Sequence, residues 1–349
     1  MRKLRAAIVG AGLIAVKKHI QAFLKLKSKV ELIAICDVNV QAAQKVVDSL
    51  GLSTAVCGDL SEMLSSNNLD LLDIATPPQT HAKLAVLAMQ HGCHLFIEKP
   101  MALTMLDCDE IVNMSQKYGI KVCVGHSDLF YWPFIKARRL VARGDIGDFR
   151  GMRILLSTPT DYMTAHEDHW AHRLPGGVIG ETGPHAVYMS LAFINPIREV
   201  NVTAKKLLDY SWSRFEDYRI DLIGDNGISS ITLSYATDEW IARLDIMGSK
   251  ATLMLDLEGM YLVQYRRHSL KPVTIGLSLL RESAQIAWDL LSNVGQFATR
   301  RLHGTHDILI EQFVDSIRNE TEPPVTVEEG REAVRVINMI VERLEEKYG

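Results

Sequence analysis

The chain has 349 residues, 47% of them hydrophobic and 23% charged, which is the balance of a folded protein long enough for two domains. Lys and Arg total 38 against 42 Asp and Glu, so the net charge of -4 disfavours nucleic-acid binding. No apolar stretch approaches the ~18–20 residues of a membrane-spanning helix. The five cysteines, odd in number and without a CxxC pair, predict buried thiols in a reducing cytoplasm.

The first 125 residues alternate short apolar runs with segments that suit helices. The predicted strands are Ala6–Val9, Val30–Ile35, Leu71–Ile74, Leu95–Ile97 and Lys121–Val124, and the predicted helices are Lys17–Leu26, Val40–Leu50, Leu60–Ser65, Thr80–His91 and Thr104–Tyr118. Such alternation is typical of βαβ units around a parallel sheet. We therefore expect an α/β domain with a parallel sheet over residues 1–125.

The pattern changes after Gly125, where strands follow one another with few helices between them. The predicted strands are Phe149–Leu156, Glu199–Leu208, Tyr218–Ile223, Ile228–Tyr235, Trp240–Met247 and Ala251–Leu257, and the predicted helices are Phe134–Arg143, Leu277–Thr299, His306–Arg318 and Val327–Lys347. Short turns such as GDNG and GSK join several of these strands, which favours antiparallel pairing. We expect an α+β domain with a mainly antiparallel sheet over residues 126–349.

A glycine motif, Gly10-x-Gly12-x-x-Ala15, follows the first predicted strand and precedes a helix. The first glycine permits a tight turn, the second lets the backbone approach a pyrophosphate, and the small third residue allows close helix–strand packing. This context predicts dinucleotide binding at Gly10 and Gly12, with Leu13 and Ile14 beside them.

Asp37 ends the second predicted strand, where an acid should bind a ribose 2′-hydroxyl. Val38 and Asn39 follow it, so no Arg or Lys is adjacent to bind a 2′-phosphate. The Asp37 carboxylate would also repel such a phosphate. The sequence therefore predicts NAD rather than NADP.

Three further segments occur in a characteristic order: Ala75-Thr76-Pro77-Pro78, Glu98-Lys99-Pro100, and Gly176-Gly177 followed by Glu181-Thr182-Gly183-Pro184-His185. Together with the glycine motif, they resemble the Gfo/Idh/MocA family of sugar oxidoreductases over nearly the whole chain. The resemblance implies a Rossmann domain followed by an α+β domain with a large open sheet, with substrate between them.

The resemblance also implies roles for individual residues. Lys99 matches the lysine that touches both the nicotinamide region and the substrate hydroxyl, and His185 matches the histidine that takes the hydroxyl proton. Glu181 stands where the family usually has Asp, four residues before His185, and would orient the imidazole. A histidine exchanges protons near neutral pH, and a cation stabilises developing alkoxide charge.

The resemblance also implies that Thr76, Pro77, Glu98 and Lys99 lie around the cofactor. Substrate candidates are Lys99, His185, His126 after the fifth predicted strand, and the Trp170 and Arg173 that precede the glycine pair. Trp170 could stack its ring on a sugar.

A rival pattern is formed by His166, His169 and His172, which recur every three residues. On a helix this spacing splays the outer pair, and it is not the HExxH motif of zinc enzymes. We therefore expect no metal there and interpret the segment as a polar rim facing a sugar.

The segment 265–303 is basic, since six Arg or Lys minus two acids give +4, and apolar residues recur in it at helical spacing. It predicts a helix that covers the sheet or forms a subunit interface. The alternative is that residues 277–299 lie on an anionic membrane surface.

The sequence thus predicts a cytoplasmic, NAD-dependent oxidoreductase acting on a hydroxyl or keto carbon of a sugar, sugar derivative or nucleotide-sugar. A homodimer or homotetramer is expected from the family resemblance. Two alternatives remain: a redox-neutral lyase or glycosidase-like enzyme that holds NAD tightly, and a non-catalytic sugar or NAD sensor.

Overall fold

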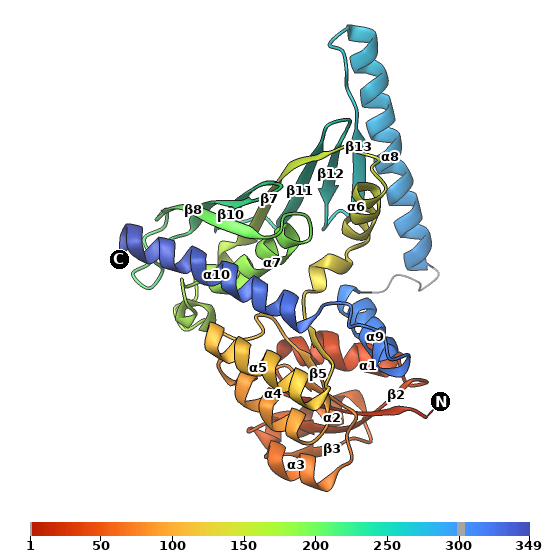
Figure 1. The fold of residues 1–349 in the computed structure, drawn as a ribbon, viewed down its shortest axis with the longest axis vertical. Helices are drawn as coiled ribbons and strands as arrows, with labels where there is room; N and C mark the ends of the chain where they lie inside the picture. The colour runs from red at the N-terminus through yellow and green to blue at the C-terminus, as the bar shows by residue number, and fades with distance from the viewer. Residues whose placement is uncertain (1, 299–303) are drawn as a thin grey trace. The chain divides into compact units, whose positions relative to one another are not determined.

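The computed structural model describes residues 2–298 and 304–349 and divides into two compact units (Figure 1). The first comprises Met1–Ser127 and His303–Arg335, and the second Asp128–Leu302 and Val336–Gly349. The sequence-based boundary assigned all of 126–349 to the second domain, whereas 303–335 returns to the first unit. The reason is α9 (Thr305–Arg318), whose buried Leu309, Ile310 and Phe313 cover α1 and β5.

The first unit contains a six-stranded parallel sheet in the order β3-β2-β1-β4-β5-β6. Its strands are β1 (Leu4–Val9), β2 (Val30–Cys36), β3 (Ala55–Cys57), β4 (Leu71–Ile74), β5 (His94–Ile97) and β6 (Val122–Val124). Five were predicted, and the three-residue β3 was missed. The order reverses between β1 and β4, which is where ligands bind in doubly wound sheets.

Helical segments connect these strands: η1 (Ala15–His19), α1 (Ile20–Lys25), α2 (Val40–Leu50), α3 (Leu60–Ser66), η2 (Pro78–Thr80), α4 (His81–Gln90) and α5 (Met105–Tyr118). Asn39, Asp59 and Thr104 cap α2, α3 and α5 by accepting a backbone N–H of the first turn. The predicted helix over 17–26 begins instead as the π-helical turn η1.

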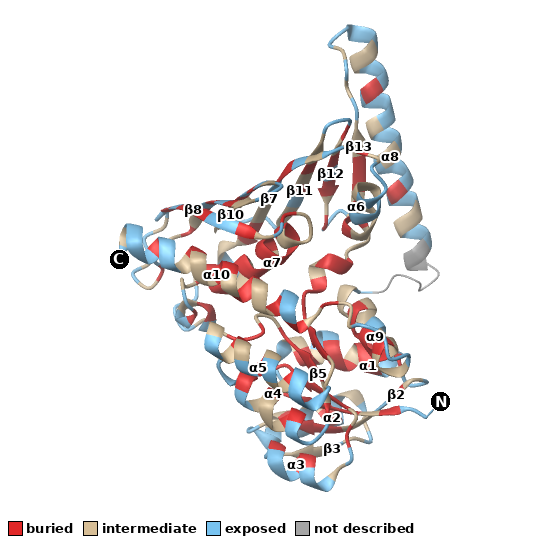
Figure 2. Ribbon diagram, viewed as in Figure 1, coloured by how far each residue is buried: buried red, intermediate tan, exposed pale blue. Residues whose placement is uncertain are grey.

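The second unit contains a seven-stranded sheet in the order β13-β12-β11-β7-β10-β9-β8. Its strands are β7 (Phe149–Pro159), β8 (Ile197–Lys205), β9 (Asp217–Gly224), β10 (Gly227–Thr237), β11 (Ile241–Gly248), β12 (Thr252–Asp256) and β13 (Tyr261–Tyr265), and only β7 and β10 pair in parallel. Buried and exposed residues alternate along β8 and β9, so one face lies on the core and the other is open (Figure 2).

The remaining helical elements are η3 (Ser127–Phe130), α6 (Trp132–Ala142), η4 (Thr160–Tyr162), η5 (Trp170–Arg173), α7 (Ile179–Leu191), α8 (Pro272–Ala298) and α10 (Val327–Tyr348). The helix α7 continues through Pro184. The predicted fold class, a Rossmann domain followed by an α+β domain with an open, mainly antiparallel sheet, is confirmed. All five cysteines are free thiols, and all but Cys57 are buried.

Candidate functional site

The glycine loop that follows β1 has the geometry its motif predicts. Gly10 has φ of 100°, and a Cβ there would lie 2.4 Å from the backbone oxygen of Ala75, so only glycine fits. A Cβ at Gly12 would meet nothing within 4 Å, which leaves the backbone open to a bound group. The loop therefore lies against the end of β4 and presents its outer side at Gly12.

Asp37, at the end of β2, is joined to this loop. Its Oδ2 accepts the N–H of Ala11 at 2.7 Å, and its Oδ1 accepts the N–H of Asn39 at 2.8 Å. Each carboxylate oxygen keeps a lone pair that can accept a ribose hydroxyl. The residues present thus fit a dinucleotide without a 2′-phosphate, beside Leu13, which is exposed, and Ile14, which is half-buried.

The loops after β4 and β5 are tied together by the buried His81. Its Nε2 lies 2.8 Å from the backbone oxygen of Thr76, and its Nδ1 lies 3.0 Å from that of Pro100. Burial lowers the pKa of His81, so the ring is neutral and donates to one carbonyl at a time. Thr76 and Pro77 are thereby held next to the turn that carries Lys99.

Lys99 follows β5 and is half-buried. Its backbone N–H donates to Oε2 of Glu98 at 2.9 Å, so the Glu98 side chain fixes the backbone from which the Lys99 side chain projects.

Behind Glu98 lies the buried ion cluster, formed by His19, Asp73, Glu98 and His306. His19 is fully buried, with Nδ1 2.8 Å from Oδ2 of Asp73 and Nε2 2.9 Å from Oε1 of Glu98. Burial by itself lowers the pKa of His19, but the charge of Asp73 and the hydrogen bonds to both carboxylates outweigh it and raise the pKa to about 10. His19 is therefore an imidazolium that donates to two carboxylates.

His306 completes the cluster, with Nε2 3.4 Å from Oε1 of Glu98. Ligand atoms of His19, Glu98 and His306 lie within 4.8 Å of one another, a set that could hold a metal ion. Binding a metal would require His19 to give up the proton shared with Glu98. Because the His19 imidazolium already occupies this position and donates to Glu98, we interpret the cluster as an ion network that fixes Glu98.

In the second unit, His185 on α7 is held by Asp128 of η3. The Nδ1 of His185 lies 2.7 Å from Oδ2 of Asp128 and 2.7 Å from the hydroxyl of Tyr188, which accepts the Asp128 N–H at 3.1 Å. A carboxylate only accepts, so Nδ1 carries the proton and Nε2 keeps its lone pair. The arrangement leaves Nε2 as the basic nitrogen.

The sequence analysis did not name Asp128, which contacts His185, and it predicted Glu181 as the group that orients His185. Glu181 lies half-buried in the first turn of α7, and its predicted role as the group that orients His185 stays a prediction. Trp170 and Arg173 are exposed at either end of η5, whereas His126 is buried after β6. Lys99 and His126 belong to the first unit, whereas Trp170, Arg173 and His185 belong to the second. The prediction that Lys99 and His185 meet at one site therefore stays a prediction.

The three histidines of the rival pattern have separate surroundings. His166 Nε2 lies 2.7 Å from the backbone oxygen of Asp161, and His169 Nδ1 accepts the N–H of Ala171. His172 Nε2 is buried and has no hydrogen-bond partner among the described residues. Within the described part of the chain, His166, His169 and His172 do not form a metal-binding group.

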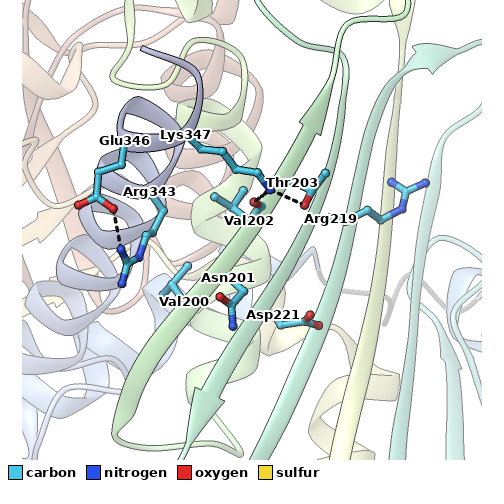
Figure 3. Close-up of a pocket in the computed structure, with 9 residues that line it drawn as sticks. All are labelled: Val200, Asn201, Val202, Thr203, Arg219, Asp221, Arg343, Glu346 and Lys347. Carbon is cyan, nitrogen blue, oxygen red and sulfur yellow. Dashed lines mark hydrogen bonds and ion pairs between the residues drawn. The ribbon is translucent and has the colours of Figure 1, made fainter.

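A pocket of about 690 Å³ lies where the last turns of α10 pass β8 and β9 (Figure 3). Lys347 donates to the backbone oxygen of Val202 and to Oγ1 of Thr203, and Arg343 pairs with Glu346. The residues that line the pocket are not the predicted site residues. Its two arginines are ion-paired, Arg219 with Asp217 and Arg343 with Glu346, and Lys347 donates to neutral oxygens.

Two family models match the chain. One, described as an oxidoreductase family with an NAD-binding Rossmann fold, covers residues 4–126, and the other, a GFO/IDH/MocA C-terminal domain, covers residues 134–254. The chain belongs to the Gfo/Idh/MocA family. The predicted family, oxidoreductase class and NAD cofactor are confirmed.

Other members of the Gfo/Idh/MocA family match nearly the whole chain. An inositol 2-dehydrogenase of Salmonella paratyphi B is 23% identical over 335 residues, which are 92% of this chain and 88% of that protein. This chain is also similar to the structure of the WlbA dehydrogenase from Bordetella pertussis in complex with NADH and UDP-GlcNAcA. The two sequences are 20% identical, and the TM-score is 0.79 over 99% of this chain and 98% of that one.

An oxidoreductase from Agrobacterium radiobacter in complex with NAD+, L-tartaric acid and magnesium shares the fold as well. It is 18% identical, with a TM-score of 0.81 over 99% of this chain and 97% of that chain. The Gfo/Idh/MocA architecture therefore extends over both units, although the identities are low.

Proposed function

We propose that this Gfo/Idh/MocA oxidoreductase transfers a hydride between NAD and a hydroxyl or keto carbon of a sugar, sugar derivative or nucleotide-sugar. Lys99 and His185 are the catalytic residues, and Asp128 is a positioning residue. The observation that carries the proposal is the His185–Asp128 hydrogen bond of 2.7 Å, because it leaves a basic nitrogen on a residue that the family motif assigns to proton transfer.

Oxidation of an alcohol removes a hydride from carbon and a proton from oxygen. The bound nicotinamide supplies the hydride acceptor. Nε2 of His185 takes the hydroxyl proton, and Asp128 stabilises the imidazolium that forms. The Lys99 ammonium stabilises negative charge that develops on the oxygen.

The backbone of Lys99 is fixed for this task. The Glu98 carboxylate that accepts the Lys99 N–H is itself held by the His19 imidazolium. Precise placement matters because a reacting group misplaced by about 1 Å can lower a rate by about 100-fold.

Two observations support a sugar-like substrate. The exposed ring of Trp170 offers an apolar face for a sugar, and Arg173 beside it can pair with a carboxylate or phosphate. The relatives include an enzyme named for inositol and a dehydrogenase crystallised with a UDP-sugar acid.

We also propose a homodimer or homotetramer that uses the open face of the seven-stranded sheet. Exposed side chains of alternate residues line this face, among them Asn201, Arg219 and Asp221, opposite the buried Val200 and Ile220. Sedimentation velocity of the full chain tests this, and a monomer at micromolar concentration would contradict it.

The test of the activity is a panel of polyols, sugars, sugar acids and nucleotide-sugars assayed by the absorbance of reduced nicotinamide. With the active substrate, Lys99→Met should lower turnover by at least about 10²–10³-fold while the affinity for NADH stays within a few-fold. The control is Lys83→Met, because Lys83 is an exposed lysine on α4.

The variant Asp128→Asn tests the role of His185 in proton transfer. An amide can present a donor to Nδ1, so the proton moves to Nε2 and turnover should fall by about 10²–10⁴-fold, with little change in KM. Asp238→Asn, at an exposed carboxylate, is the matched control. Full turnover in Lys99→Met would refute the assignment, and NAD that survives gel filtration with no net redox change would favour the redox-neutral alternative.

A further inference from the structure

The 27-residue helix α8 has its polar and apolar sides reversed relative to a surface helix of a globular protein. Ser278, Glu282, Gln285, Asp289 and Asn293 are spaced by three or four residues and so fall within about 80° of arc. We call these five residues the polar face of α8. All are buried or half-buried, whereas residues on the rest of the circumference are mostly exposed.

The polar face lies against β13, the outermost strand of its sheet (Figure 1). Asp289 Oδ2 accepts the N–H of Leu262 at 3.0 Å, and Gln285 Oε1 accepts the N–H of Gln264 at 3.0 Å. A third contact runs from Asn293 Nδ2 to the backbone oxygen of Met260 at 2.8 Å. These side chains satisfy backbone groups that an edge strand would otherwise leave open.

The two acids of the polar face are neutralised from within the same unit. Glu282 pairs with Arg267, which also donates to Ser278 Oγ, and Asp289 pairs with Lys136. The orientation of α8 is therefore fixed by directed contacts, and its opposite side is held away from the sheet.

That opposite side carries mainly apolar residues. Figure 2 shows that much of the surface of α8 is exposed. Leu280, Trp288 and Leu291 are 69%, 73% and 68% exposed, and Val273 and Leu277 continue the surface toward the start of the helix. We call these five residues the outer face of α8. A contiguous apolar surface of this kind marks an interaction site.

The charges around the outer face indicate its partner. In residues 265–295, all described, the exposed charged groups are Arg266, Lys271 and Arg281, whereas both acids belong to the inward polar face. A second copy meeting this surface with its own outer face would bring further exposed cations and no exposed acid from this segment. A layer of anionic lipid headgroups would complement the cations and accept the Leu and Trp side chains.

We propose that the outer face of α8 binds this enzyme to an anionic membrane surface. No helix among the described residues is long and apolar enough to cross a bilayer. The helix therefore lies along the interface, with Trp288 and the leucines in the headgroup–acyl boundary and the neighbouring cations at the phosphates. Arg300 and Arg301, also basic, lie outside the described residues.

The experiment is co-sedimentation of the full chain with vesicles of phosphatidylcholine alone or mixed equally with phosphatidylglycerol. The wild type should bind the anionic vesicles much better than the neutral ones and lose binding in high salt. The double variant Leu280→Gln/Leu291→Gln should bind at least about tenfold more weakly, because both side chains lose their apolar contact with lipid.

The matched control is Leu106→Gln/Leu207→Gln, which changes two exposed leucines outside α8 and should leave vesicle binding unchanged. Arg266→Gln/Lys271→Gln should weaken binding to anionic vesicles only. Failure of the wild type to bind anionic vesicles, or equal binding by the outer-face and control variants, would overturn the proposal. So would a change of oligomeric state in the outer-face variant without lipid, since the face would then bind a second copy.

Discussion

Two regions of the molecule turn polar groups inward, and they do so with different consequences. The buried ion cluster of the first unit places an imidazolium between two carboxylates, with His19 and Asp73 fully buried. The polar face of α8 turns amide, hydroxyl and carboxylate side chains toward a sheet edge, where most of them remain partly exposed.

The buried ion cluster and the polar face of α8 differ in how far their charged groups are shielded from water. Within the cluster, His19 and Asp73 are fully buried, so each of these charges depends on its partner, and removing one leaves the other buried and uncompensated. Most contacts of α8 are neutral or lie near the surface and contribute little to stability, whereas the buried Asp289 carboxylate accepts the Leu262 N–H and pairs with Lys136. The cluster therefore fixes the backbone next to Lys99, whereas the contacts of α8 set which side of the helix faces outward.

The largest effect is expected from His19→Gln. The variant leaves Asp73 and Glu98 without a buried cation, so the free energy of unfolding should fall by about 3–5 kcal/mol. Urea denaturation followed by circular dichroism measures it. His91→Gln, at an exposed histidine after α4, should stay within about 0.5 kcal/mol, and an equal change in both variants would contradict the charged state assigned to His19.

The pH dependence of stability tests the same charge. The pKa of His19 is about 10 in the folded protein against 6.5 when unperturbed, so the folded state holds an extra proton between these values. The stabilisation is complete below pH 6.5 and is lost as the pH rises through 10. The unfolding free energy should thus fall more steeply over this window in the wild type than in His19→Gln, and parallel curves would contradict this.

The pattern of hydrophobic residues predicted much of the fold, because this pattern reflects which residues of each helix or strand are buried. Leu71–Ile74 was located to the residue, whereas the half-exposed β3 (Ala55–Cys57) and the edge strand β13 (Tyr261–Tyr265) lacked a clear pattern. The return of α9 to the first unit is a long-range contact that no local pattern encodes.

The predicted site depended on motifs, which name residues but not their partners. Asp128 was missed because it lies far from His185 in sequence. The ion cluster had one visible signal: Asp73 is a charged residue within the apolar run LLDI, and a buried carboxylate requires a partner. Nothing in the sequence identified His19 and His306 as belonging with it.

A smaller effect is expected from Asp289→Leu. The variant removes the acceptor of the Leu262 N–H and the partner of Lys136, which should cost about 1–3 kcal/mol of unfolding free energy. Hydrogen exchange should show faster exchange at β13 than in the wild type. Asp238→Asn serves as the surface control, and unchanged exchange at β13 would show that the polar face does not hold the edge strand.

The smallest effect on stability is expected from the outer face of α8. Leu280→Gln and Leu291→Gln remove side chains that are already mostly exposed, so each should change the unfolding free energy by less than about 0.5 kcal/mol. Removing the buried His19 cation should therefore lower the unfolding free energy more than removing both exposed leucines. If either Leu variant instead costs several kcal/mol by urea denaturation in the absence of lipid, the outer face is buried in the folded assembly and functions as part of a core.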